Sequence, residues 1–281
     1  MNARLLGSVV TAIAIFGSTP DVADAAAPTN DLYGNAVVIG SIPFETTVDT
    51  TDATASAGDP NCASSSHTAW YRFTPARSGT YVIDVNGLWD SGGPSLGVFS
   101  GHRTSPTVVA CEVAIGGEDL AGVAAARVTL TAGVRYHVMV GTPTGFPDAP
   151  GGFMIVRVVH YVPPAAKVHI LSGTVDRATR TLTLTGNSSC RGTYAYGSIE
   201  GMPDIRATVR QQRSTWIARG MGETYPDAGC WPIAPWTMTL TSGTSHPFRR
   251  GISTVTARGY ECNLWECVTR TTKAKIRLEW S

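Results

Sequence analysis

The residues of this chain that could perform chemistry are six histidines, six cysteines and scattered serines and carboxylates. Serine hydrolysis needs a nucleophile, an imidazole base and an orienting acid, but no G-x-S-x-G sequence presents a serine for that role. The histidines stand singly, at His67, His102, His137, His160, His169 and His246. His137 falls inside an alternating pattern that predicts an outward strand position rather than a base. We therefore expect no catalytic residues of this kind.

Paired carboxylates are a second arrangement that catalyses hydrolysis. Glycosidases need two carboxylates that face one another. Four glutamates of the C-terminal half fall in predicted loops, namely Glu200, Glu223, Glu261 and Glu266. Solvated charges are the better interpretation of all four. Glycine-rich phosphate loops, H-E-x-x-H and EF-hand sequences do not occur. We expect a protein that is not an enzyme and that uses no cofactor and no metal.

Tryptophans are sharper candidates for binding, because an exposed indole offers an apolar face and an N–H donor. Trp231 and Trp236 bracket two prolines, and Trp265 lies in the short loop between the last two cysteines. Trp236 opens an alternating strand and is expected in a core, as is Trp70. We predict Trp231 and Trp265 as ligand-binding residues. The alternative is that each packs against its own loop.

The leading segment predicts export. Arg4 precedes an apolar stretch at 5–17, and Ala23-Asp24-Ala25 supplies an A-x-A cleavage sequence. The stretch is shorter than the roughly twenty residues that cross a bilayer. We predict a signal peptide at 1–25 and a secreted mature chain with no membrane span. An even set of cysteines in such a chain favours disulfides, and the absence of C-x-x-C spacing argues against zinc.

Charge divides the chain in two. Residues 26–160 hold six arginines and eleven acidic residues, and residues 161–281 hold fifteen basic and eight acidic residues. Two compositions support two domains. The basic half could attract anionic polymers, but its charges are dispersed, which favours ordinary solvated strand faces, and we expect no nucleic acid partner.

Short strands bounded by turn residues fill both halves. The predicted strands are 36–39, 68–75, 79–86, 94–100, 107–113, 124–131, 134–141 and 152–160, then 167–175, 180–186, 204–211, 215–220, 236–241, 251–260 and 267–279. Pro163 and Pro164 cannot join a central ladder, so they mark a break. The prediction is an all-β chain with a jelly-roll-like β-sandwich at 26–160, a proline-rich linker at 161–166 and an immunoglobulin-like β-sandwich at 167–281.

The first half resembles the bacterial pre-peptidase C-terminal (PPC-like) domain. The residues that carry the resemblance are N-D-L-Y-G-N-A at 30–36, W-Y-R-F-T-P at 70–75, L-G-V-F-S-G at 96–101 and A-G-V-R-Y at 132–136. The resemblance implies a non-catalytic jelly-roll sandwich of the kind appended to secreted hydrolases, with roles in secretion, substrate contact or surface retention. No peptidase domain accompanies it here. The second half more loosely resembles immunoglobulin-like domains of secreted actinobacterial proteins, through S-C at 189–190, T-V-R-Q at 208–211 and P-W-T at 235–237.

Disulfide pairing follows from this division. Cys62 and Cys111 are the two cysteines of the first half. For the second half we predict Cys190–Cys230 and Cys262–Cys267, because a four-residue loop can close a hairpin end and because the resembling domains keep two cysteines there. Cys190–Cys262 is the alternative, since Tyr260-Glu261-Cys262 is similar to the Tyr-x-Cys of an immunoglobulin strand.

These observations predict a secreted, non-catalytic binding or accessory protein that contacts cell wall, matrix polymer or a protein partner. Its partner would be a polysaccharide or a protein surface. The alternative is an uncharacterised secreted hydrolase with a site at the domain junction. A purely structural spacer is a third hypothesis.

Overall fold

The computed structural model describes residues 26–62, 65–87, 93–114, 122–143, 151–193, 204–215, 217–224 and 233–281. They form sixteen β-strands and one 3-10 turn, η1 (Tyr33–Asn35). Within these residues no helix is both long enough and apolar enough to cross a membrane. The all-β prediction is confirmed. The predicted signal peptide lies outside the described residues.

Strands β1 to β9 form the first sandwich, from two sheets with the orders β1-β3-β8-β5-β6 and β2-β9-β4-β7. β1 runs parallel to β3, and the other pairs are antiparallel. The strands are β1 (Val37–Ile39), β2 (Phe44–Asp49), β3 (Ser65–Phe73), β4 (Gly79–Gly87), β5 (Ser95–His102), β6 (Ser105–Val113), β7 (Val123–Leu130), β8 (Tyr136–Pro143) and β9 (Phe153–His160).

The two sheets enclose a core of aliphatic and aromatic side chains that alternate along each strand. Tyr81, Ile83 and Val85 of β4 point into it, as the period-2 pattern predicts. β5 and β8 contribute Leu96 and Val138, both fully buried. The alternation of apolar residues along each strand therefore places these side chains in the main core of the first sandwich.

A second layer of buried side chains covers the opposite face of the five-stranded sheet. Trp70, Phe99 and Met139 pack there with Cys62, and Tyr33 of the N-terminal turn closes over them. All eight residues of β8 are consequently buried. Trp70 is in a core, as predicted.

His137 corrects one expectation. We expected its side chain to face solvent, but it is only 8% exposed. The N-terminal turn covers the face of β8 on which it lies. The period-2 pattern identified that face correctly, but the covering segment comes from a distant part of the chain.

Strands β10 to β16 form the second sandwich, a seven-stranded sheet with the order β13-β12-β15-β16-β10-β11-β14. β10 meets β16 at only two register pairs, Thr174–Glu279 and Val175–Trp280. The sheet bends there into two layers that share one core, which includes Trp236 as predicted. The strands are β10 (Ala165–Val175), β11 (Leu182–Arg191), β12 (Asp204–Gln212), β13 (Ile217–Thr224), β14 (Ala234–Leu240), β15 (Gly251–Cys262) and β16 (Cys267–Trp280).

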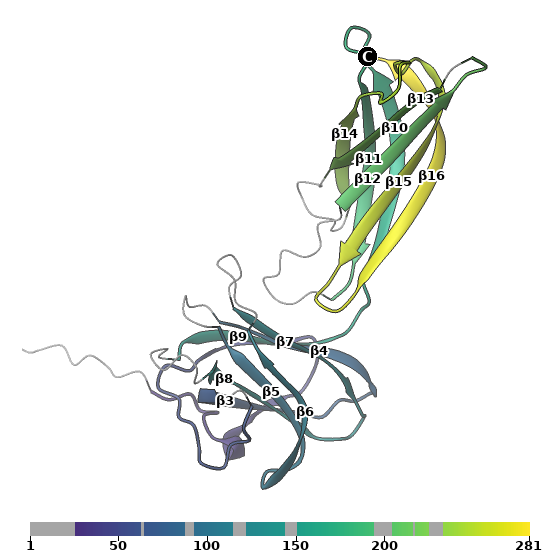
Figure 1. Cartoon of the computed structure of the whole chain (residues 1–281). Helices are drawn as coiled ribbons and strands as arrows, with labels where there is room; N and C mark the ends of the chain where they lie inside the picture. The colour runs from purple at the N-terminus through teal and green to yellow at the C-terminus, as the bar shows by residue number, and fades with distance from the viewer. Residues whose placement is uncertain are drawn as a thin grey trace, which may run out of the picture.

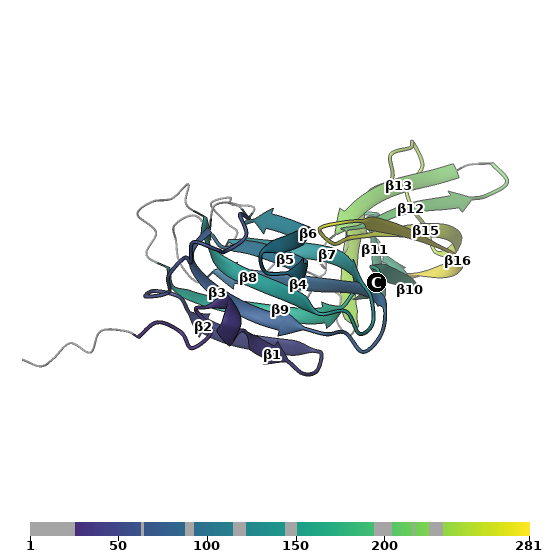
Figure 2. The ribbon, with the colours of Figure 1, turned by 90° about the horizontal axis from the view of Figure 1, so that it is seen from below.

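The chain leaves β9 at His160 and enters β10 at Ala165, so Pro163 and Pro164 fall between the sandwiches (Figures 1 and 2). In Figure 1 the closed end of the β15–β16 hairpin points toward the sheet that contains β4, β7 and β9. The prediction of two successive β-sandwiches is confirmed.

Candidate functional site

Disulfides fasten both sandwiches. Cys62 bonds Cys111 with Cα atoms 5.5 Å apart, and Cys262 bonds Cys267 with Cα atoms 4.0 Å apart. Both pairings confirm the prediction, and the second removes the Cys190–Cys262 alternative. Cys190 is disulfide-bonded, and its predicted partner Cys230 lies outside the described residues.

Trp265 lies in the tight loop that joins β15 to β16. The side-chain oxygen of Asn263 accepts hydrogen bonds from the backbone N–H groups of Trp265 at 3.0 Å and Glu266 at 2.9 Å. An Asn side chain that bonds the backbone two residues ahead commonly fixes such a turn. Asn263 is itself buried and donates to the Tyr161 hydroxyl and the Thr193 carbonyl, at 3.2 and 3.3 Å.

The indole of Trp265 packs at the junction of the two sandwiches. Its ring meets Tyr161 edge-on with centroids 5.8 Å apart, and the guanidinium of Arg127 on β7 lies over both rings, at 5.0 Å from Tyr161 and 5.9 Å from Trp265. Glu266 accepts from the Tyr161 hydroxyl and lies 3.5 Å from Arg127. We call these residues, with Asn263, the junction cluster. Trp265 is half-buried there, and its role in ligand binding stays a prediction. Trp231 lies outside the described residues.

The carboxylates near this junction already have partners. Asp84 of β4 is fully buried and accepts three hydrogen bonds from Arg157 of β9, the shortest at 2.6 Å. Glu266 is held by Tyr161 and Arg127. A glycosidase needs one carboxyl to donate a proton and another to attack or to activate water. These contacts instead fit structural ion pairs.

The other glutamates weighed as hydrolytic candidates are scattered. Glu223 lies 3.4 Å from Arg206, which also pairs with Asp204 at 3.0 Å. Burial raises the pKa of Asp204, and the nearby Glu223 charge adds to this while Arg206 opposes it. Glu261 is buried at the end of β15, and Glu200 lies outside the described residues. Within the described residues, no group of three His, Cys, Asp or Glu side chains is placed to hold a metal ion.

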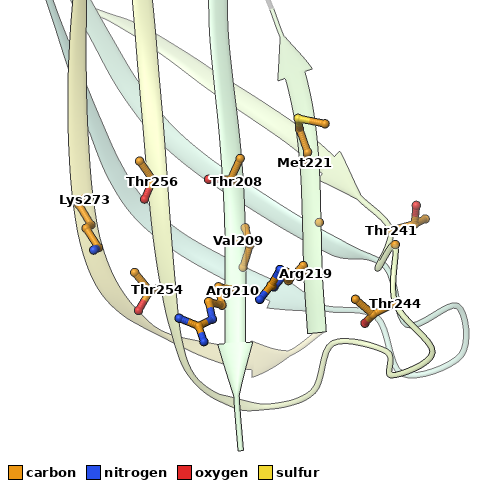
Figure 3. A pocket seen from close by; sticks show the side chains of 12 residues that line it. Thr208, Val209, Arg210, Arg219, Met221, Thr241, Thr244, Thr254, Thr256 and Lys273 are labelled. Carbon is orange, nitrogen blue, oxygen red and sulfur yellow. The ribbon is translucent and has the colours of Figure 1, made fainter. Parts of the chain in front are cut away.

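A groove with a volume of about 910 Å³ lies on the outer face of the second sandwich (Figure 3). We call it the threonine–arginine groove. It is lined by Thr208, Val209, Arg210, Arg219, Gly220, Met221, Thr241, Gly243, Thr244, Thr254, Thr256 and Lys273. None of these is a carboxylate, a histidine or a cysteine.

Strand register builds the floor of this groove in two rows. One row crosses the sheet as Met221, Thr208, Thr256 and Lys273, and the next as Arg219, Arg210 and Thr254. Because alternate residues share a face, basic residues that are dispersed in the sequence gather on one surface. Figure 3 shows Arg210 and Arg219 on neighbouring strands, with the guanidinium group of Arg210 directed toward Thr254.

A loop forms the wall of the groove. Gly243 donates its N–H to the Arg219 carbonyl at 2.8 Å, and the Thr244 hydroxyl donates to the Ile217 carbonyl at 3.0 Å. These bonds fasten the segment after β14 to the edge strand β13. The groove is therefore a built feature of the sheet and its neighbouring loop.

Arg210 and Arg219 are direct cross-strand neighbours of like charge, an arrangement that destabilises a sheet. Within the described part of the chain neither forms an ion pair with a carboxylate, nor does Lys273. The sequence did not reveal this pair, because the two arginines are separated by a turn and only the register brings them together.

No family model and no curated protein matches the chain. Among solved structures, it is similar to the pre-peptidase C-terminal domain of a collagenase from Bacillus anthracis, with 17% identity and a TM-score of 0.30 over 44% of this chain and 93% of that one. This is the family that the motifs of the first half resemble.

Two further structures align over more of the chain. A DUF4785 family protein from Legionella pneumophila has 8% identity and a TM-score of 0.25 over 84% of this chain and 60% of that one. A β-glucuronidase from Bacteroides uniformis has 12% identity and a TM-score of 0.21 over 74% of this chain and 27% of that one. The chain thus spans less than two thirds of both proteins, and we take no functional argument from these similarities.

Proposed function

We propose that the protein is a secreted, non-catalytic binding or accessory protein that contacts a cell-wall or matrix polymer through the threonine–arginine groove. One observation carries the proposal: the threonine–arginine groove presents cations and hydroxyl groups with no carboxylate, histidine or cysteine among its lining residues. Such a surface can bind an anionic, hydroxyl-rich chain, while it lacks the groups that most often transfer protons in hydrolysis.

The geometry suits an extended ligand. The first floor row crosses four neighbouring strands and the second crosses three, and strands lie about 4.8 Å apart, so charged and hydroxyl groups recur across the groove at that spacing. Guanidinium groups bind carboxylate and phosphate oxygens in pairs, and threonine hydroxyls both donate and accept. A polymer with repeated anionic groups would also screen the repulsion between Arg210 and Arg219.

Cosedimentation of the mature chain with purified cell-wall and matrix polysaccharide fractions tests the proposal. The double variant Arg210→Glu with Arg219→Glu should bind about tenfold more weakly, a loss of about 1.4 kcal/mol. Lys167→Glu with Arg191→Glu is the matched control, because both residues are exposed on the same sandwich outside the groove. Equal binding by wild type and both double variants would contradict the role of the groove.

Reducing-end release from the bound polymer tests the non-catalytic part separately. We expect no release above the level of a boiled sample. Release that a junction variant such as Glu266→Gln abolishes would favour the alternative hydrolase.

A further inference from the structure

A smaller pocket lies on the other sandwich, where the N-terminal turn covers one end of the five-stranded sheet. It has a volume of about 650 Å³ and draws its polar side chains from η1, β3, the β5–β6 turn and the start of β8. These side chains are Tyr33, Arg72, Thr74, His102, Arg103, Arg135 and His137. No carboxylate is among the described residues that line it.

The floor of the pocket is a fixed aromatic pair. The Tyr33 hydroxyl lies 3.0 Å from Nδ1 of His137, and the two rings stack with centroids 4.3 Å apart. Tyr33 also meets the buried Trp70 edge-on at 5.1 Å. Because His137 is 8% exposed and Trp70 is fully buried, the core holds both polar groups of the floor in place.

Three arginines surround this floor. Arg72 is the cross-strand partner of His137, and Arg103 lies over the Tyr33 ring at 5.3 Å. Burial lowers the pKa of His137, and the charges of Arg135 and Arg72 lower it further. Burial raises the pKa of Tyr33, while Arg103 and Arg135 oppose the rise. Arg135 therefore acts on both groups of the floor, while Arg72 acts on His137 and Arg103 on Tyr33.

This cluster of positive charge lies in a sandwich whose overall composition is acidic. Residues 26–160 contain eleven acidic residues and only six arginines, of which three line this pocket. Within the described residues none of the three forms an ion pair with a carboxylate. Clustered guanidinium groups repel one another unless an anion lies between them.

We propose that this pocket of the first sandwich is an oxyanion site, which takes a carboxylate or phosphate group between Arg72, Arg103 and Arg135 above the Tyr33–His137 pair. Planar guanidinium groups match both anions through paired N–H donors. The Tyr33 hydroxyl supplies a further donor from the floor when His137 is not its acceptor. The site is separate from the threonine–arginine groove and does not depend on the function proposed for it.

Titration of the mature chain with inorganic phosphate, and separately with glucuronate, tests the proposal at constant ionic strength. Saturable binding of phosphate alone identifies a phosphate site, and binding of glucuronate alone or of both identifies a site that accepts a sugar carboxylate. Absence of saturable binding of either anion would overturn the proposal.

Variants locate the binding. The double variant Arg103→Gln with Arg135→Gln should lower the affinity for the anion about tenfold or more. Tyr33→Phe should lower the affinity several-fold while keeping the stacked ring pair. Arg77→Gln is the matched control, because Arg77 is an exposed arginine of the same sandwich outside the pocket. Equal weakening by Arg77→Gln would show non-specific charge attraction and overturn the site.

The groove variant Arg210→Glu with Arg219→Glu separates this site from the proposed function. It should keep the small-anion affinity of wild type even where it loses polymer binding. Loss of the small anion in that variant would place the binding in the groove and contradict the pocket. Circular dichroism of every variant confirms that the exposed substitutions leave the fold intact.

Discussion

The first sandwich covers the central strands β3, β8 and β5 of its five-stranded sheet on both faces, whereas the second leaves the outer face of β13-β12-β15-β16 open to solvent. β8 in the first is buried at all eight positions, while β12 in the second alternates between buried and exposed residues. The N-terminal turn and the Cys62 segment make the difference, because they pack over the outer face of the first sheet. The covered face carries the pocket with the Tyr33–His137 floor, and the open face carries the threonine–arginine groove.

The largest expected effect concerns the core of the second sandwich. Trp236 lies against Gly186 so closely that a Cβ at Gly186 would come 2.1 Å from the indole ring. Trp236→Ala should therefore leave a cavity and cost about 5 kcal/mol of unfolding free energy, at the upper end of such changes. Urea unfolding followed by circular dichroism measures it.

Trp265→Ala is the matched comparison. Its ring contacts only Tyr161 and Arg127 among the aromatic and cationic contacts of the described residues. We expect a loss of about 1 kcal/mol or less, together with weaker ligand retention if Trp265 binds as predicted. A loss as large as that of Trp236→Ala would make Trp265 a core residue and remove it from the predicted binding residues.

The disulfides give the next contrast between the sandwiches. Cys62–Cys111 closes 49 residues of chain, and Cys262–Cys267 closes five. Loop-closure entropy gives about 4 kcal/mol for the first and about 2 kcal/mol for the second. The double variant Cys62→Ala with Cys111→Ala should thus destabilise the first sandwich more than Cys262→Ala with Cys267→Ala destabilises the second. Guanidinium unfolding of the two double variants compares them, and the reverse order would contradict the expectation.

Local patterns predicted most of the strands for a physical reason. Fifteen of the sixteen observed strands begin within three residues of a predicted one, because alternation and turn residues act over short distances. Phe44–Asp49 escaped the prediction because it carries four polar residues among six and lies at the edge of its sheet. An edge strand needs fewer apolar side chains than a central one.

Surface features proved harder to predict than strands. The pair Arg210–Arg219 depends on hairpin register, and the Tyr33–His137 pair joins residues 104 positions apart. Neither pairing can be predicted from the residues that are adjacent in the sequence. Trp265, in contrast, was a reasonable candidate from its loop, but its contacts with Arg127 and Tyr161 depend on how the hairpin meets the first sandwich.

The covered face of the first sandwich should also make its stability depend on pH. The ordinary pKa of histidine is 6.5, and burial, Arg135 and Arg72 hold the pKa of His137 below it. Well above pH 6.5 both folded and unfolded states carry a neutral imidazole at residue 137. As pH falls through the interval below 6.5, the unfolded chain takes up the proton first, so stability is lost. His137→Gln should flatten this slope of unfolding free energy between about pH 7 and pH 5. An unchanged slope would show that other groups cause it.

The smallest expected effect sharpens the contrast at the open face. Arg210→Glu converts the like-charged pair with Arg219 into an opposite-charged one, which should raise the stability of the second sandwich by about 0.5 kcal/mol. The same change should weaken polymer binding by the groove. A residue that costs stability and supports binding is the expected signature of a functional surface.

Lys167→Glu provides the control, because it makes the same charge change outside the groove. Thermal unfolding at low ionic strength measures the gain in stability of Arg210→Glu. Added salt should reduce this gain, because it screens the charges. If Arg210→Glu lowered stability, the two arginines would not repel each other in the folded sheet, and the argument that an anion belongs between them would fail.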